Sequence, residues 1–298
     1  MKTMRPSRSE FTSVRGLRHH LRRWGSPDAP PLFLLHGWMD VSATFQFLVD
    51  ELEGDWNVIA PDWRGCGKTQ WLHQAYHFSD LLADLDQLLE QLSPGTPATI
   101  VGHSMGGNVA GLYAGVRPHR VARLVTLEGI GHWARSAGDT LVNYTEWLDS
   151  VNNPGPVATF ADRAELAARL AQANPRLRGD RAGFLAEHLG RQNSAGTVSL
   201  AVDPYHRVTF SHLLHSYADY RACWSQITAP VLVVTARDSA VRAMLARKDP
   251  TGSEFDQASR LACFADVREA MLDDAGHNMH HDQPGALARH IEAFLRLV

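Results

Sequence analysis

The sequence predicts an α/β fold in which a mostly parallel sheet is flanked by helices and a helical cap is inserted after the sixth strand. Short apolar runs, each ending in a polar or glycine-containing turn, alternate with segments whose apolar residues recur at helical spacing. Such alternation is typical of parallel strands joined by right-handed crossovers. The alternation stops after Gly131 and resumes at Ala229, which indicates an insertion.

The first 131 residues are expected to hold six strands and two helices. Arg15-Gly16 predicts the tight turn of a hairpin between residues 11–14 and 17–24. The apolar runs that follow are typical of strands buried on both faces, and the leucine spacing after them indicates an amphipathic helix. The four later strands are expected at 31–38, 56–65, 98–104 and 121–129, and the two helices at 78–92 and 105–116.

The rest of the chain is expected to complete the sheet after the insertion. Residues 132–222 show several short helical patterns, the clearest at 161–175 and 179–189, and no convincing buried strand. The sequence therefore predicts a core formed by residues 1–131 and 223–298, covered by a helical cap at 132–222. Within the second part of the core, strands are expected at 229–238 and 267–272, and helices at 255–264 and 284–298.

Composition excludes several classes of protein. A formal net charge of −3 gives no general attraction to nucleic acid or to anionic membranes. The widely spaced Cys66, Cys223 and Cys263 argue against a disulfide framework and favour a reducing compartment. No apolar run approaches the roughly 18 residues that span a bilayer, and the N-terminus lacks a secretory apolar region. We expect a cytoplasmic protein that binds a small-molecule acyl substrate, with no nucleic-acid or membrane partner, and homo-oligomerisation stays open.

Ser104 lies in a glycine-rich turn between a predicted strand and a predicted helix. Gly102-His103-Ser104-Met105-Gly106 matches the G-x-S-x-G pattern, in which small residues let the backbone fold tightly around an exposed serine hydroxyl. The helix that follows directs its N-terminus at the serine, where negative charge is favoured. The pattern predicts Ser104 as a nucleophile, with the backbone N–H of Met105 as one donor to an oxyanion.

The motifs of the chain resemble those of the α/β-hydrolase superfamily along nearly its whole length. The resemblance rests on "LLHGW", "PDWRGCGKT", "VGHSMGG", "VLVVTARD" and "AGHNMHHDQP", and within the superfamily it is greatest to bacterial relatives of serine-hydrolase-like proteins. It implies an α/β-hydrolase sheet with a cap. It also implies that the backbone N–H of Trp38, just after His36-Gly37, is the second oxyanion donor.

His277 is the expected general base. It follows the strand and turn "VREAMLDDAG", late in the chain, where the order serine, acid, histidine places it. His280 and His281 follow at helical spacing, but without a carboxylate or cysteine pattern beside them the sequence does not favour a metal site. We therefore expect no metal and no cofactor.

Two carboxylates compete to orient His277. Asp238 follows "VLVVT" in the turn where most serine members of the superfamily carry the acid, and it is the favoured assignment. Glu128 ends the preceding strand, where some members keep the acid as glutamate. A carboxylate at the buried end of a core strand is costly unless it is paired, so Glu128 stays open.

A serine at this position indicates acyl chemistry. We expect a serine hydrolase that cleaves a small or medium carboxylic ester through an acyl-enzyme on Ser104. Lactones, amides or carbon–carbon bonds are alternative substrates, and a ligand-binding receptor with slow turnover is an alternative function. The predicted cap offers aromatic residues for an apolar pocket, namely Trp133, Tyr144, Trp147, Phe160 and Phe184.

Overall fold

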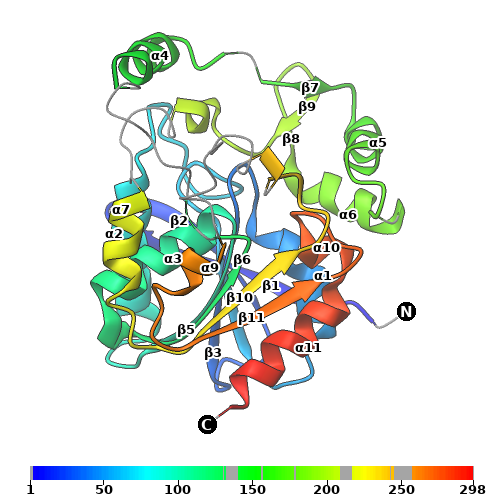
Figure 1. Cartoon of the computed structure of the whole chain (residues 1–298). Helices are drawn as coiled ribbons and strands as arrows, with labels where there is room; N and C mark the ends of the chain where they lie inside the picture. Colours follow the sequence, from blue (N-terminus) through cyan, green and yellow to red (C-terminus); the bar gives the residue numbers. More distant parts are fainter. Residues whose placement is uncertain are drawn as a thin grey trace.

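A twisted sheet of eight strands runs through the middle of the computed structural model (Figure 1), in the order β1-β2-β4-β3-β5-β6-β10-β11. The structure describes residues 3–129, 131, 140–155, 157–177, 179–208, 217–241, 243–244 and 257–297. The strands are β1 (Ser7–Val14), β2 (Leu17–Trp24), β3 (Pro31–Leu35), β4 (Asn57–Pro61), β5 (Ala98–His103), β6 (Val121–Leu127), β10 (Val231–Ala236) and β11 (Val267–Leu272).

The pairing of these strands confirms the mostly parallel sheet. β1 and β2 form the antiparallel hairpin, whose turn residues Arg15 and Gly16 have φ of 48° and 79°. β2 pairs antiparallel with β4, and every later neighbour is parallel. Strands β3 to β6 and β10 are almost wholly buried, because helices cover both faces of the sheet.

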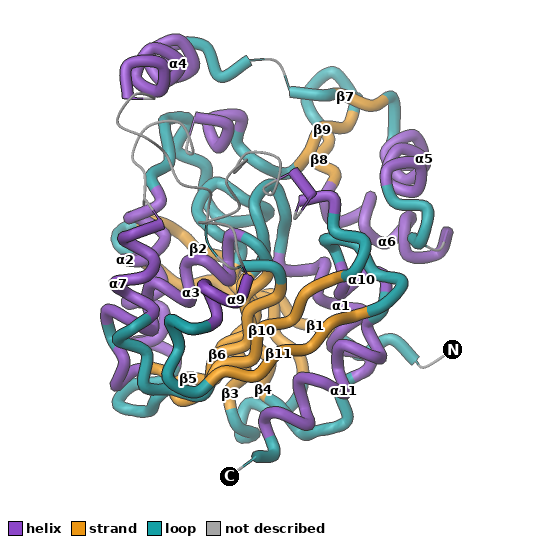
Figure 2. The backbone as a smooth tube through the Cα atoms, viewed as in Figure 1, coloured by secondary structure: helices purple, strands orange, loops and turns teal. Residues whose placement is uncertain are grey.

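Helices flank the strands on both sides (Figure 2). Leucines of α2 (Phe78–Leu92), most of α3 (Met105–Val116), and Tyr220 and Trp224 of α7 (Tyr217–Trp224) pack on one face. Apolar residues of α1 (Gln46–Glu51) and α11 (Pro284–Leu295) pack on the other. The short helices α1 and α10 (Met279–Asp282) were not expected from the sequence, because six and four residues are too few to show helical periodicity.

Between β6 and β10 the chain forms a mixed segment that lies beyond the carboxyl ends of the parallel strands, at the top of Figure 1. Its described α-helices beyond the sheet are α4 (Thr140–Asn152), α5 (Arg163–Ala173) and α6 (Gly179–Leu189), whereas α7 lies lower and packs on α3. Three short strands, β7 (Thr159–Phe160), β8 (Gly190–Gln192) and β9 (Val198–Leu200), form a second sheet. The sequence did not predict this sheet, since strands of two or three residues show no alternation.

The segment contacts the rest of the chain through α6, among other described residues. Leu185 and Leu189 of α6 pack with Val41 and Phe47, which follow β3. The predicted boundary between residues 222 and 223 falls within α7, a helix packed on α3. The division into core and cap stays a prediction. Among the described residues, no helix combines the length and apolar character that crossing a membrane requires.

Candidate active site

Ser104 occupies the sharp turn between β5 and α3. Its backbone has φ 51° and ψ −116°, a left-handed conformation that non-glycine residues rarely adopt. Two hydrogen bonds hold it: the Ser104 amide donates to the carbonyl of Leu127 over 2.8 Å, and the Ser104 carbonyl accepts from the amide of Asn108 over 3.0 Å. Such strain persists only where the surroundings impose it, and it is typical of a nucleophile turn.

Glycines around Ser104 allow backbone segments to approach closely. A Cβ on Gly102 would lie 2.5 Å from the carbonyl oxygen of Gly106, and a Cβ on Gly106 would lie 2.2 Å from that of Leu35. Gly107 is in similar contact with Thr126 and Gly129. The small residues of the motif are therefore required by contacts between β3, β5, β6 and α3.

Gly106→Ala is expected to lower the free energy of unfolding by about 1–3 kcal/mol, because the new methyl group meets backbone that cannot rotate away. Urea unfolding followed by circular dichroism measures the change. Gly183→Ala is the matched control: its Cβ would meet no atom within 4 Å in the exposed face of α6, and it should stabilise by about 0.5–1 kcal/mol. Equal stability of the two variants would contradict the packing argument.

His277 lies in the loop after β11, beside the nucleophile turn. Its ring centroid is 4.8 Å from that of His103, and its carbonyl oxygen is 2.9 Å from Nε2 of His103. Asp282 holds the same loop by accepting the Gly276 amide over 2.8 Å. The His277 side chain is 22% exposed, and its Nδ1 lies 3.4 Å from Oε2 of Glu128. The structure thus brings His277, Glu128 and the residue before Ser104 together.

Glu128 is held rigidly in its place at the end of β6. Its side chain is 1% exposed and its φ is 56°. Oε1 accepts the Ala236 amide over 2.9 Å, and Oε2 accepts the hydroxyl of Ser239. A buried carboxylate with two donors and an imidazole has the partners that its burial requires. Sequence reasoning missed Ser239, whose role depends on the neighbouring parallel strand β10.

Asp238 lies elsewhere, although it is only one residue before Ser239. Its side chain is 46% exposed and accepts from the Arg176 guanidinium over 2.6 Å. Arg176, which follows α5, also contacts Asp274 over 3.0 Å. The acid that the sequence favours is therefore paired with the segment between β6 and β10, and the carboxylate that lies against His277 is Glu128.

The loop after β3 lies against Ser104. A Cβ on Gly37 would be 3.4 Å from the Cβ of Ser104, so the Gly37–Trp38 backbone passes directly beside the nucleophile. Trp38 is 45% exposed, and its indole donates to the His206 carbonyl over 3.2 Å. Met105 is the first residue of α3, where backbone N–H groups have no acceptor within the helix. Both predicted oxyanion donors thus come from backbone next to Ser104.

His36 braces this loop. Its Nε2 accepts the Trp63 amide over 3.0 Å, its carbonyl accepts the Trp63 indole over 2.9 Å, and its Nδ1 lies 2.8 Å from the Gly37 carbonyl. Burial lowers the pKa of His36, so a neutral imidazole can accept at Nε2 and donate at Nδ1. Sequence reasoning missed this role, since it depends on a tryptophan after β4.

The aromatic residues expected in a pocket have varied surroundings. Phe184 packs on Phe47 with ring centroids 5.4 Å apart, so it contributes to packing between α6 and the core. Tyr144 is 48% exposed. Trp133 lies outside the described residues.

Comparisons with known proteins agree with this geometry. A family model described as alpha/beta hydrolase fold matches residues 30–284. The serine hydrolase-like protein of Danio rerio is 29% identical over 315 residues, which cover 99% of this chain and 90% of the relative.

Two solved structures have a similar fold. The thioesterase domain from the curacin biosynthetic pathway superposes with a TM-score of 0.83 at 26% identity, over 97% of this chain and 99% of that domain. An esterase from Mycobacterium tuberculosis superposes with a TM-score of 0.70 at 20% identity, over 98% of this chain and 92% of that one. The second likeness concerns the fold alone.

Proposed function

The chain belongs to the α/β-hydrolase fold family, and from that premise we propose that it is a serine hydrolase that cleaves small or medium carboxylic esters, or a related acyl bond, through an acyl-enzyme on Ser104. The observation that carries the proposal is the strained Ser104 turn with His277 and Glu128 beside it. The name of the thioesterase domain, which is 26% identical to this chain, supports acyl transfer as the reaction class.

The reaction proceeds in two halves. The Ser104 hydroxyl attacks the substrate carbonyl carbon while Nε2 of His277 takes the hydroxyl proton. The carbonyl oxygen becomes an oxyanion that accepts the backbone N–H groups of Met105 and Trp38. The bond to the leaving alcohol then breaks, and the alcohol takes the proton from His277. Water, deprotonated by His277, attacks the acyl-enzyme and releases the acid and the Ser104 hydroxyl.

Glu128 serves as the acid in this proposal. Its Oε2 lies 3.4 Å from Nδ1 of His277, so it favours the tautomer with a proton on Nδ1 and a lone pair on Nε2. It also stabilises the imidazolium that forms when His277 takes the serine proton. The hydroxyl of Ser239 and the amide of Ala236 keep the carboxylate in position.

The segment between β6 and β10 serves as the cap that selects the acyl group. Its support is its place beyond the carboxyl ends of the strands, where ligands of open α/β sheets bind. Arg176 connects it to Asp238 and Asp274, and Asn174 donates to Asp282 over 2.6 Å. These contacts join the segment to the loop that carries His277.

A fluorophosphonate probe and a series of nitrophenyl esters from acetate to decanoate test the proposal on the purified protein. We expect one covalent adduct per chain, located on Ser104 by peptide mass spectrometry, and hydrolysis that depends on acyl length. A folded protein that neither labels nor hydrolyses any ester or thioester would overturn the proposal. Tight ligand binding with very slow turnover would favour the receptor alternative.

A further inference from the structure

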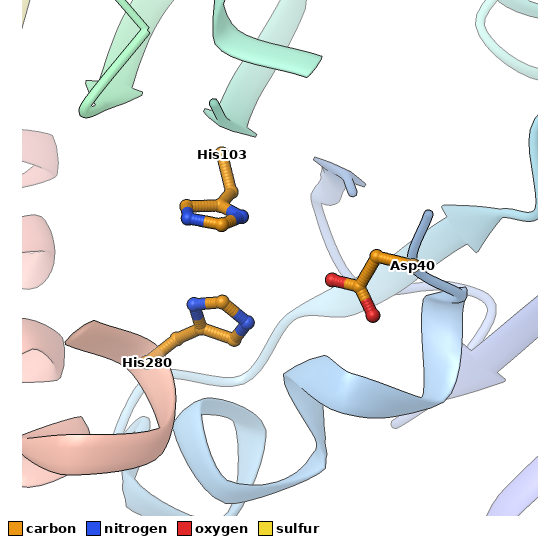
Figure 3. A group of neighbouring side chains, drawn as sticks. All are labelled: Asp40, His103 and His280. Carbon is orange, nitrogen blue, oxygen red and sulfur yellow. The ribbon is translucent and has the colours of Figure 1, made fainter. Parts of the chain in front are cut away.

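Three side chains that could bind a metal ion lie close together beyond the end of β5. Asp40 follows β3, His103 is the last residue of β5, and His280 lies in α10. One donor atom from each lies within 4.8 Å of the others, and Figure 3 shows the two rings facing one another with the carboxylate beside them. The ring centroids of His103 and His280 are 4.5 Å apart.

The two histidines have ring nitrogens without a partner among the described residues. His280 is wholly buried, and neither its Nδ1 nor its Nε2 has a hydrogen-bond partner; Nδ1 of buried His103 has none either. A buried polar atom left without a partner destabilises the folded protein. Three such atoms in one cluster are groups that a bound ion or an ordered water would satisfy.

The tautomer of His103 suits metal binding. Its Nε2 is 2.9 Å from the carbonyl oxygen of His277, which can only accept, so Nε2 carries the proton and Nδ1 carries the lone pair. Histidines that bind metals usually donate their other N–H to a backbone carbonyl in this way. Gly37 leaves room at the lone pair, since a Cβ there would lie 3.0 Å from Nδ1.

Asp40 supplies the negative charge. Val41 donates its amide to Oδ1 over 2.8 Å, and Thr44 donates its hydroxyl to Oδ2 over 3.0 Å, which orients the carboxylate. No described lysine or arginine forms an ion pair with it. Asp40 is partly buried, and a cation beside its carboxylate would offset the cost of removing that charge from water.

We propose that Asp40, His103 and His280 bind one divalent transition-metal ion of the zinc class, with the fourth coordination position open. Two imidazoles and a carboxylate suit Zn²⁺ or Co²⁺ and not Mg²⁺ or Ca²⁺, which take oxygen ligands. A tetrahedral ion with bonds of about 2.1 Å needs donors about 3.4 Å apart. The donor atoms here lie within 4.8 Å of one another. When the ion binds, the two most distant donors must therefore approach each other by up to about 1.4 Å.

The site is separate from the acyl chemistry but mechanically linked to it. His103 precedes Ser104 in the chain, and its Nε2 donates a hydrogen bond to the carbonyl of His277. A bound ion would therefore fix the side chain of His103, which is linked to both the nucleophile and its base. Binding itself does not depend on the Ser104 hydroxyl. Metal binding can therefore be tested independently of the proposed hydrolase activity.

The test is titration of metal-free protein with Zn²⁺ by calorimetry and with Co²⁺ by visible absorption. We expect one ion per chain and the intense absorption of four-coordinate Co²⁺. His280→Gln and Asp40→Asn should each weaken binding at least about tenfold. His281→Gln is the matched control, since it removes a neighbouring buried imidazole outside the donor set, and Ser104→Ala should bind the ion as the wild type does.

Two results would overturn the proposal. One is wild-type protein that neither binds Zn²⁺ saturably at one per chain nor gives the four-coordinate Co²⁺ spectrum, in which case the unpartnered nitrogens contact water. The other is unchanged affinity in folded His280→Gln and Asp40→Asn, which would place the bound ion on other histidines. The Co²⁺ spectrum of the unaltered protein keeps the proposal testable if a variant does not fold.

Discussion

Replacing Ser104 with alanine is expected to lower kcat/KM for the best ester at least about 10,000-fold and to abolish fluorophosphonate labelling. The hydroxyl is the group that forms the acyl-enzyme, and no other side chain replaces it in the turn between β5 and α3. Initial rates with nitrophenyl esters and in-gel fluorescence measure the two effects. The variant should remain folded, because alanine removes one atom and keeps every backbone hydrogen bond of the turn.

His277→Ala should lower kcat/KM by a similar factor. The double variant Ser104→Ala/His277→Ala should be no less active than either single variant, because the two groups act as a unit. Ser225→Ala is the matched control: its hydroxyl donates to the Ala222 carbonyl at the end of α7, in the part of the chain that packs on α3. It should keep wild-type rates. Hydrolysis that survives in Ser104→Ala, or labelling mapped to another residue, would refute the assignment.

The nucleophile turn could be predicted because its determinants are local. Ser104 and its glycines lie within five consecutive residues, and the strand before and helix after them are strongly apolar. The core strands could be predicted equally well, since burial on both faces of a strand produces an uninterrupted apolar run in the sequence. Elements that depend on tertiary contact, such as the three short strands β7, β8 and β9, leave no such pattern.

The sequence could not show whether Asp238 or Glu128 is the acid, because contacts between residues far apart in the chain distinguish the two. Arg176, 62 residues before Asp238 in the chain, pairs with it at the surface. Ser239 and the amide of Ala236 hold Glu128 across the β6–β10 pair. Both acids lie near the carboxyl ends of adjacent strands, so strand pattern alone makes them equivalent, and the neighbouring residues distinguish them.

The metal cluster illustrates the same limit. The sequence shows His280 and His281 together but not the carboxylate that completes a site, and the expectation was that no metal binds. Asp40 is 63 residues from His103, which is itself 177 residues from His280. Only the closure of β3, β5 and α10 on one another brings their donor atoms within 4.8 Å.

Glu128→Gln is expected to lower kcat about 1,000- to 10,000-fold, whereas Asp238→Asn should change it less than about threefold. The amide of glutamine presents a donor or a neutral acceptor to His277, so it neither enforces the Nδ1–H tautomer nor stabilises the imidazolium. The side chain of Asp238 is 46% exposed and pairs with Arg176, and exposed ion pairs contribute only about 0.2–1 kcal/mol.

The two variants are matched, because each converts one carboxylate to its amide with almost no change of volume. Thermal unfolding separates positioning from folding: both proteins should melt cooperatively, and in Glu128→Gln the loss of kcat should far exceed any loss of folded protein. Glu128→Asp should recover only part of the activity, since the shorter side chain keeps the charge but lengthens a 3.4 Å contact. If Asp238→Asn were instead the more damaging change, the loop of Asp238 would have to leave Arg176 and turn towards His277 when substrate binds. Glu128 would then be a structural carboxylate that holds β6 to β10.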